Sequence, residues 1–308
     1  MDERRSRPET AQAQPRRGPR GLWLLLFLLA WNSSEAGYAA ERLPDPEDGA
    51  MAIRSYANPY FGLAYPFAAG WKEGVAGPPP SAAGYYVLGA ADSKDGISGN
   101  LLIAAQDMFF APQPFDNAMA QIKASRKTMA ALAGMRIDRD PTAVSIAGRD
   151  FGRLDYSGVG LCRTLLATEI RCPIVSFIVT ANDPALLQQA VLSLAHLSLP
   201  PEPPAQALGG AEPGANFPVC IKDYATGENL LRRVEPRSAA PYFARIAVRI
   251  IIGADGGVKH THVIKASDEQ RKNIEEALTQ WRLKPLQVKG EAVEVETGLA
   301  FEFKPPAQ

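Results

Sequence analysis

The last part of the chain, residues 244–303, carries a spacing of apolar and turn residues that few folds can accommodate. The dipeptide Asp255-Gly256 separates two strand-like runs, at 246–252 and 258–264, and it favours a hairpin turn because glycine tolerates a positive φ. The first run has a period of two, so we expect a strand with one buried face and one face in water. The residues expected on its buried face are Ile246, Val248, Ile250 and Ile252.

A helix with clear start and stop signals follows this hairpin. Ser267 and Gln270 have the spacing of a capping box, in which the serine hydroxyl accepts a helical amide and the glutamine reaches back to the serine amide. Pro285 ends the helical region, because proline lacks an amide donor and clashes with the preceding turn. One apolar stripe is expected along the helix, at Ile274, Ala277, Leu278 and Trp281.

The chain closes with a second alternating stretch, at 293–303. Its dry face is expected to hold Val293, Val295 and Thr297. Its wet face is expected to hold Glu294 and Glu296. Together with the hairpin and the helix, this strand predicts a small β-β-α-β unit.

Several short motifs in residues 241–303 have the order and spacing of a known family. They are Asp255-Gly-Gly-Val258 after the first strand, Trp281-Arg-Leu-Lys-Pro285 at the end of the helix, and Gly290-Glu-Ala-Val293 and Phe301-Glu-Phe303 around the last strand. The region resembles the TonB C-terminal domain, with Leu283 in the position of an aromatic residue. The resemblance implies a domain at 220–308.

The resemblance also implies a binding site. In TonB C-terminal domains the last strand ends a small sheet and holds an extended segment of an outer-membrane receptor through backbone hydrogen bonds. Carried over to this chain, the contact would follow the last strand, and two residues would brace the helix behind it. The implied residues are Val293, Val295, Thr297, Leu299, Trp281 and Arg282. Trp281 is expected to be mainly a core residue.

Residues 54–199 predict a separate α+β domain, in which an antiparallel sheet is covered by helices. One helix is expected at 115–132, and another after Asp183-Pro184, where aspartate is the cap and proline lies in the first turn. Strands are expected at 60–66, 85–90, 101–105, 143–146, 151–156, 159–166 and 170–180.

The opening of this domain resembles a second family. Asn58-Pro-Tyr-Phe-Gly-Leu-Ala-Tyr-Pro66 and Gly70-Trp71 are similar to the start of PsbP-like domains, and the order of the expected elements agrees. This resemblance implies a lumenal or periplasmic role in binding or assembly rather than a reaction.

Residues 1–36 have the features of a secretory signal peptide. Arginines at 16, 17 and 20 precede a short apolar core at 22–31, and small residues suitable for cleavage follow. The core is shorter than the ~20 apolar residues that cross a bilayer. We therefore expect an exported, periplasmic protein. The alternative is an uncleaved inner-membrane anchor, and only that form would associate with the membrane.

Two further segments separate the expected domains. Residues 37–53 are polar and contain prolines, which predicts a disordered leader. Residues 200–219 are rich in proline, glycine and alanine, which predicts a short, stiff linker.

The three cysteines require an interpretation in an oxidising compartment. Cys162 and Cys172 flank a hairpin expected to turn near 167–168. In one register they face each other and form a disulfide, whereas a shift of one residue puts them on opposite faces. Cys220 is then expected to be a buried spare thiol. The spacing fits no structural zinc site, so no metal is expected.

The remaining residues exclude several functional classes. Basic and acidic residues balance, at 33 each, so the chain lacks the basic footprint of a nucleic-acid-binding protein. Nucleophile-elbow, phosphate-loop and zinc-protease motifs are missing, so we expect neither an enzyme nor a cofactor. His260 and His262 share one strand face, where a solvated surface is expected rather than a metal site.

Two hypotheses of function remain. The first is a periplasmic protein-binding module of the TonB C-terminal type, which pairs with an extended segment of an outer-membrane receptor or another envelope protein, with TonB-dependent transport as one such setting. The alternative is an exported small-ligand-binding or assembly-factor protein that acts through its PsbP-like domain.

Overall fold

The computed structural model describes residues 43–75, 77–200, 218–238 and 245–303. Residues 43–200 form an N-terminal lobe, and residues 218–238 and 245–303 form a C-terminal lobe. Strands predominate over helices, and the fold is of the expected α+β class. The expected signal peptide at 1–36 and most of the expected linker lie outside the described residues. Within the described ranges, none of the helices is both long and apolar enough to cross a membrane.

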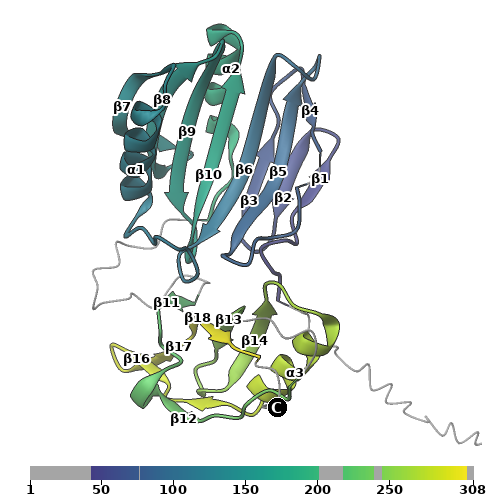
Figure 1. Cartoon of the computed structure of the whole chain (residues 1–308), viewed down its shortest axis with the longest axis vertical. Helices are drawn as coiled ribbons and strands as arrows, with labels where there is room; N and C mark the ends of the chain where they lie inside the picture. The colour runs from purple at the N-terminus through teal and green to yellow at the C-terminus, as the bar shows by residue number, and fades with distance from the viewer. Residues whose placement is uncertain (1–42, 76, 201–217, 239–244, 304–308) are drawn as a thin grey trace, which may run out of the picture. The chain divides into compact units, whose positions relative to one another are not determined.

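A seven-stranded antiparallel sheet is the framework of the N-terminal lobe, with the order β4-β5-β6-β10-β9-β8-β7 (Figure 1). Its strands are β4 (Trp71–Glu73), β5 (Tyr85–Ser93), β6 (Gly99–Asp107), β7 (Met135–Ile146), β8 (Arg149–Gly158), β9 (Leu161–Glu169) and β10 (Pro173–Ala181). A three-stranded sheet holds β1 (Ala50–Ala52), β2 (Ser55–Asn58) and β3 (Leu63–Pro66). The helices are α1 (Ala118–Ala131) and α2 (Pro184–Ser193), with a 3-10 turn η1 (Leu194–His196).

The two faces of the seven-stranded sheet carry different layers. Val175 and Phe177 of β10 pack in one core with α2 and the three-stranded sheet, whereas Ile174 packs in another core with α1. Because successive strand residues point to opposite faces, α1 covers one face, and α2 with the three-stranded sheet covers the other. Asp183 caps α2 as expected, since its side chain accepts the amide of Ala185 at 2.9 Å.

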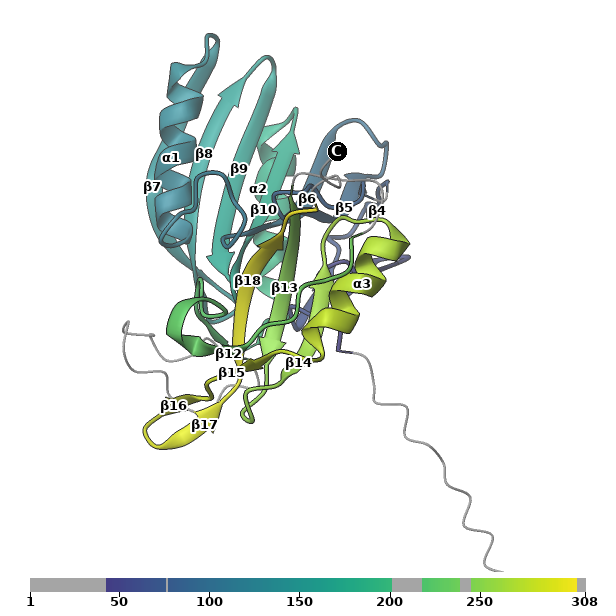
Figure 2. The same cartoon turned by 60° about the horizontal axis from the view of Figure 1, so that its bottom comes forward.

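The C-terminal lobe contains the expected order of strand, strand, helix and strand. β13 (Ile246–Ile252), β14 (Val258–Val263) and β18 (Val295–Phe301) lie side by side, with α3 (Asp268–Leu278) beside them (Figure 2). A fourth strand, β11 (Val219–Cys220), gives the sheet the order β11-β18-β13-β14. Smaller elements are η2 (Gly227–Asn229), β12 (Leu230–Arg232) paired with β15 (Arg282–Leu283), and β16 (Leu286–Val288) paired with β17 (Glu291–Val293).

Local signals in this lobe act as expected. Ser267 and Gln270 form both hydrogen bonds of the capping box at the start of α3. Gly256 has a φ of +76° in the β13–β14 turn, and a Cβ atom there would collide with the carbonyl oxygen of Leu283. The Leu283 amide donates to the Gly256 carbonyl at 2.9 Å, so this glycine serves the turn and its contact with β15.

The expected disordered leader is wrong for its described part. Residues 50–52 form β1, which pairs with β2, and the Asn58 amide group donates to the Pro46 carbonyl at 2.9 Å. Polar composition alone predicted disorder, but contacts with distant residues order this segment. Residues 37–42 lie outside the described ranges.

Candidate functional site: an interlobe ion cluster and an open strand edge

The sheet of the C-terminal lobe is buried on both faces. All seven residues of β13 are buried, although one wet face was expected. Glu296 of β18 was also expected in water, and its exposed fraction is 0%. The second face is buried because the N-terminal lobe packs against it, with Asp107 pairing with Arg249.

Charged residues of both lobes meet under this face in a group that we call the interlobe ion cluster, comprising Tyr60, Asp107, Arg171, Arg249 and Glu296. Arg249 Nη1 donates to Glu296 Oε1 at 2.6 Å, and Arg249 Nη2 pairs with Asp107. Arg171 Nη2 lies 3.0 Å from Glu296 Oε2. The Tyr60 hydroxyl donates to Glu296 Oε1 at 2.7 Å. Two guanidinium groups thus match two carboxylates, as burial of charge requires.

The surroundings of Glu296 keep its carboxyl ionised. Burial raises the pKa of the Glu296 carboxyl, but the charges of Arg249 and Arg171 and the hydrogen bonds from Tyr60 and Arg249 outweigh it, so the pKa lies below its usual value. Burial raises the pKa of the Tyr60 phenol well above its usual value, so Tyr60 stays a neutral donor. The cluster therefore joins the two lobes through paired charges.

A disulfide between Cys172 and Cys220 also joins the lobes, with the two Cα atoms 5.5 Å apart. The candidate Cys162–Cys172 bond, which the sequence left open between two registers, is therefore wrong, and Cys220 is not a spare thiol. The β9–β10 hairpin turns later than expected, so that Ile174 faces Glu169 and Cys162 faces Ala181. Cys162 is free.

One potential metal-ligand group occurs among the described residues, formed by Cys172, Cys220 and Glu296 with ligand atoms within 4.8 Å of one another. The two sulfur atoms are bonded to each other, and the carboxylate pairs with Arg171 and Arg249. In this oxidised state the group therefore offers no thiolate ligand.

The chain covers only the first part of the outer edge of β18. The Val219 amide donates to the Glu294 carbonyl at 2.8 Å, and the Ile221 amide to the Glu296 carbonyl at 3.1 Å. The Tyr224 amide then donates to Thr297 Oγ1 at 3.2 Å. No described strand pairs with the rest of this edge.

In the uncovered part of β18, the main-chain groups of alternate residues point away from β13. In a strand, the amide and carbonyl of alternate residues point to the same side. Since Glu294 and Glu296 point toward β11, Gly298 and Ala300 point toward the uncovered edge. They can therefore pair with another strand.

A cavity of about 640 Å³, which we call the edge groove, runs along this open edge. Its volume lies in the ~300–1,000 Å³ range of ligand pockets. The Arg233 guanidinium lies 5.6 Å from the centre of the Trp281 ring beside it. Apolar and backbone surface in the groove comes from Phe109, Phe110, Trp281, Gly298, Ala300 and Phe301.

The structure brings only some of the implied contact residues together. Trp281 and Leu299 line the edge groove. Trp281 is also a core residue as expected, and its indole N–H donates to the Val234 carbonyl at 2.8 Å. The remaining four residues do not line the edge groove. Val293 lies in β17, Val295 and Thr297 are buried, and Arg282 is exposed in β15.

Sequence reasoning missed the groove wall and the ion cluster. Phe109 and Phe110 follow β6 and belong to the other lobe, so no local pattern links them to β18. Arg249 did carry a signal, because it interrupts an otherwise apolar strand. A charge in such a run indicates a buried partner.

His260 and His262 do not form the solvated face that was expected. His260 Nε2 lies 2.8 Å from Asp45 Oδ1, and His262 Nε2 lies 3.1 Å from Glu47 Oε1. The acidic residues belong to the segment that was expected to be disordered, which explains both errors together.

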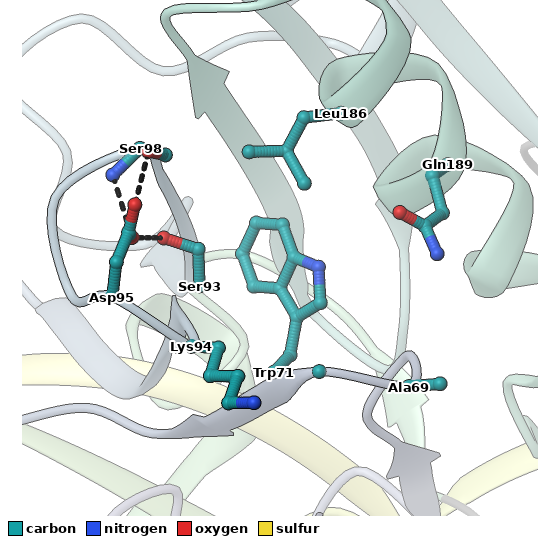
Figure 3. Close-up of a pocket in the computed structure, with 9 residues that line it drawn as sticks. Ala69, Trp71, Ser93, Lys94, Asp95, Ser98, Leu186 and Gln189 are labelled. Carbon is teal, nitrogen blue, oxygen red and sulfur yellow. Dashed lines mark hydrogen bonds between the residues drawn. The ribbon is translucent and has the colours of Figure 1, made fainter.

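A second cavity, of about 530 Å³, lies in the N-terminal lobe between α2 and the β5–β6 turn (Figure 3). Trp71 and Leu186 give it an apolar wall, and Gln189 and Lys94 give it polar groups. Asp95 accepts hydrogen bonds from Ser93, Ser98 and Ile97, which lower the pKa of its carboxyl. These bonds fix the turn that forms one side of the cavity.

No protein-family model and no curated protein matches this chain. Among solved structures, the cyanobacterial PsbP protein CyanoP of Synechocystis sp. PCC 6803 is 15% identical with a TM-score of 0.34, covering 49% of this chain and 95% of its own. LpqN of Mycobacterium tuberculosis, involved in cell envelope biogenesis, is 11% identical with a TM-score of 0.33, covering 49% and 87%. A Pseudomonas aeruginosa protein of unknown function, PA94, is 17% identical with a TM-score of 0.27, covering 43% and 83%. These values are too low to support any argument about function, and the TonB C-terminal resemblance stays a prediction.

Proposed function

We propose that this chain is an exported envelope protein whose C-terminal lobe binds an extended segment of a partner protein as an added strand. The observation that carries the proposal is the open edge of β18 at Gly298 and Ala300, beside a cavity of about 640 Å³. Backbone hydrogen bonds would give such a segment affinity, and the groove would select its side chains. β11 supports the proposal, because it already lies as a parallel strand on the same edge.

The partner that fits this proposal is an outer-membrane receptor or another envelope protein, as the TonB C-terminal resemblance implies. The contact shifts toward the C-terminal end of the implied strand, because β11 occupies the edge at Val295 and Glu296. TonB-dependent transport is the finer form of this proposal. Binding rather than catalysis, and a periplasmic location, belong to it as well.

The test is an NMR titration of residues 37–308 with an extended N-terminal peptide of an outer-membrane receptor. We expect the amide signals of Gly298 and Ala300 and the indole signal of Trp281 to shift. Ala300→Pro should abolish the shift, because proline has no amide donor and this amide does not pair with β13. Ala300→Ser, which keeps the amide, is the matched control. Unchanged signals throughout 245–303 would contradict the proposal.

A second candidate is the binding of a small ligand in the Trp71 cavity, the alternative that the sequence suggested. Figure 3 shows the nitrogen-bearing edge of the Trp71 ring turned toward the side of Gln189. Neither side chain forms a hydrogen bond with the described residues that line the cavity, so both can serve a ligand. Titration with decanoate, phenylacetate and glucose tests this, read by fluorescence of residues 37–308 with Trp281→Phe, in which Trp71 is the one remaining tryptophan. A response that Gln189→Leu removes would favour it, and no response to any of the three would count against it.

A further inference from the structure

We infer that the Cys172–Cys220 disulfide is a redox gate, which sets how much of the β18 edge a partner strand can use. The inference rests on the proposed function and adds regulation to it. The movable part of the gate is β11, and the fixed part is the β9–β10 turn that carries Cys172.

β11 is weakly held apart from this disulfide. It is two residues long and pairs with β18 at Val219–Val295 and Cys220–Glu296, and the amides of Val219 and Ile221 donate to the carbonyls of Glu294 and Glu296. Each such bond adds only modestly to stability, because the same groups bond to water when released. The next anchors along the chain are Ile221, which packs against the C-terminal core, and Tyr224, whose amide donates to Thr297 Oγ1. We therefore expect the covalent bond of Cys220 to the N-terminal lobe to decide whether the two residues of β11 stay in place.

Release of β11 would double the usable edge. With β11 in place, Gly298 and Ala300 present their main-chain groups to a partner strand. Without it, Glu294 and Glu296 present theirs on the same side. A partner strand could then pair at four alternate residues instead of two, with a matching gain in affinity.

The lobes remain joined when the disulfide is open. Arg249 and Glu296 still pair with Asp107 and Arg171 across the boundary, and these side chains are buried. Reduction is therefore expected to free β11 without separating the lobes. The disulfide controls the position of β11, whereas the buried ion pairs hold the two lobes together.

The cavity beside the disulfide gives a reductant a route to it. Cys172 and Cys220 are partly exposed, and both line a cavity of about 350 Å³. Cys162 cannot exchange with them. It faces Ala181, eight residues along β10 from Pro173, which is about 26 Å at the rise of a strand.

The reaction needs a dithiol, such as a thioredoxin-type oxidoreductase or dithiothreitol. One thiolate of the dithiol attacks a sulfur atom of the disulfide, and the other cysteine leaves as a thiolate and takes up a proton. The second thiol of the dithiol then attacks the mixed disulfide and releases the remaining cysteine. The chain gains two electrons and two protons, and the dithiol becomes a disulfide.

Hydrogen exchange measured by mass spectrometry on residues 37–308, with and without dithiothreitol, tests the release. We expect faster exchange at 219–221 and 294–296 after reduction, and unchanged exchange at 246–252. Cys172→Ser/Cys220→Ser should behave like the reduced protein, and Cys162→Ser like the oxidised one. Unchanged exchange at 219–221, or faster exchange throughout both lobes, would overturn the gate.

Affinity for a strand tests the consequence. A fluorescent peptide that copies residues 218–223 with serine for Cys220 should bind the reduced protein at least tenfold more tightly than the oxidised protein. Equal binding to both forms would overturn the gate. The receptor peptide distinguishes the two proposals: its binding to neither form would overturn the proposed function itself, whereas equal binding to both would overturn only the gate.

Discussion

Arg249 and Glu296 meet on the face of the C-terminal sheet that turns toward the N-terminal lobe, with Arg249 Nη1 2.6 Å from Glu296 Oε1. Each residue also reaches the other lobe, Arg249 through Asp107 and Glu296 through Arg171. The C-terminal lobe is therefore not a detachable module with one wet sheet face. Among its described strands, β18 offers a partner the part of its edge that β11 leaves uncovered, at Gly298 and Ala300.

Removal of the Arg249 charge should destabilise the folded protein strongly. Arg249→Met leaves Asp107 and Glu296 buried without this partner, and loss of one member of a buried pair costs about 3–5 kcal/mol. Urea unfolding followed by circular dichroism measures the effect. Arg245→Met, at an exposed position, is the matched control and should change stability by less than about 0.5 kcal/mol. Equal midpoints for the two variants would contradict the role of the cluster.

The Glu296 carboxyl should make stability depend on pH in the acid range. Its pKa is lowered in the folded state, and in the unfolded chain it is about 4.3. Its stabilising contribution is therefore complete above about pH 4.3 and is lost as the pH falls through the lower folded value. The stability advantage of the natural protein over Glu296→Gln should shrink between pH 5 and pH 2. Parallel urea midpoints over this range would contradict the prediction.

Gly298 should be essential for the close approach of the two lobes. A Cβ atom there would lie 2.6 Å from Phe109 Cβ and 2.8 Å from Phe110 Cζ. Overpacking of this kind costs about 1–3 kcal/mol, so Gly298→Ala should lower the unfolding midpoint. In Gly257→Ala, by contrast, the new Cβ atom would meet only the movable carboxylate of Asp255, at 3.3 Å. Similar losses in both variants would show that the Phe109 contact does not matter.

Local physics made the elements of this fold predictable. The capping box at Ser267, the turn at Gly256 and the cap at Asp183 each depend on residues close in sequence, and all three form as expected. Their energies arise within a few residues, so a single sequence carries the information.

Contacts between distant residues account for what could not be predicted. Cys220 bonds to Cys172 because the β9–β10 hairpin turns a few residues later than expected, a choice set by the register of the whole sheet. Glu296 has the alternation of a wet residue, yet Arg171 from the other lobe buries it. The disulfide partner of Cys220 and the burial of Glu296 depend on how the two lobes pack. The alternation of apolar and polar residues along one strand carries no information about that packing.

The disulfide assignment provides a direct test of this packing. Without reduction, a proteolytic digest should contain a linked pair of peptides with Cys172 and Cys220, and only Cys162 should react with an alkylating reagent. The bond closes a loop with a separation of 48 residues, so Cys172→Ser/Cys220→Ser should lose about 2–4 kcal/mol of stability. Cys162→Ser closes no loop and should leave the unfolding midpoint nearly unchanged. A linked peptide that contains Cys162 would instead restore the pairing suggested by the sequence and leave β11 without its covalent anchor.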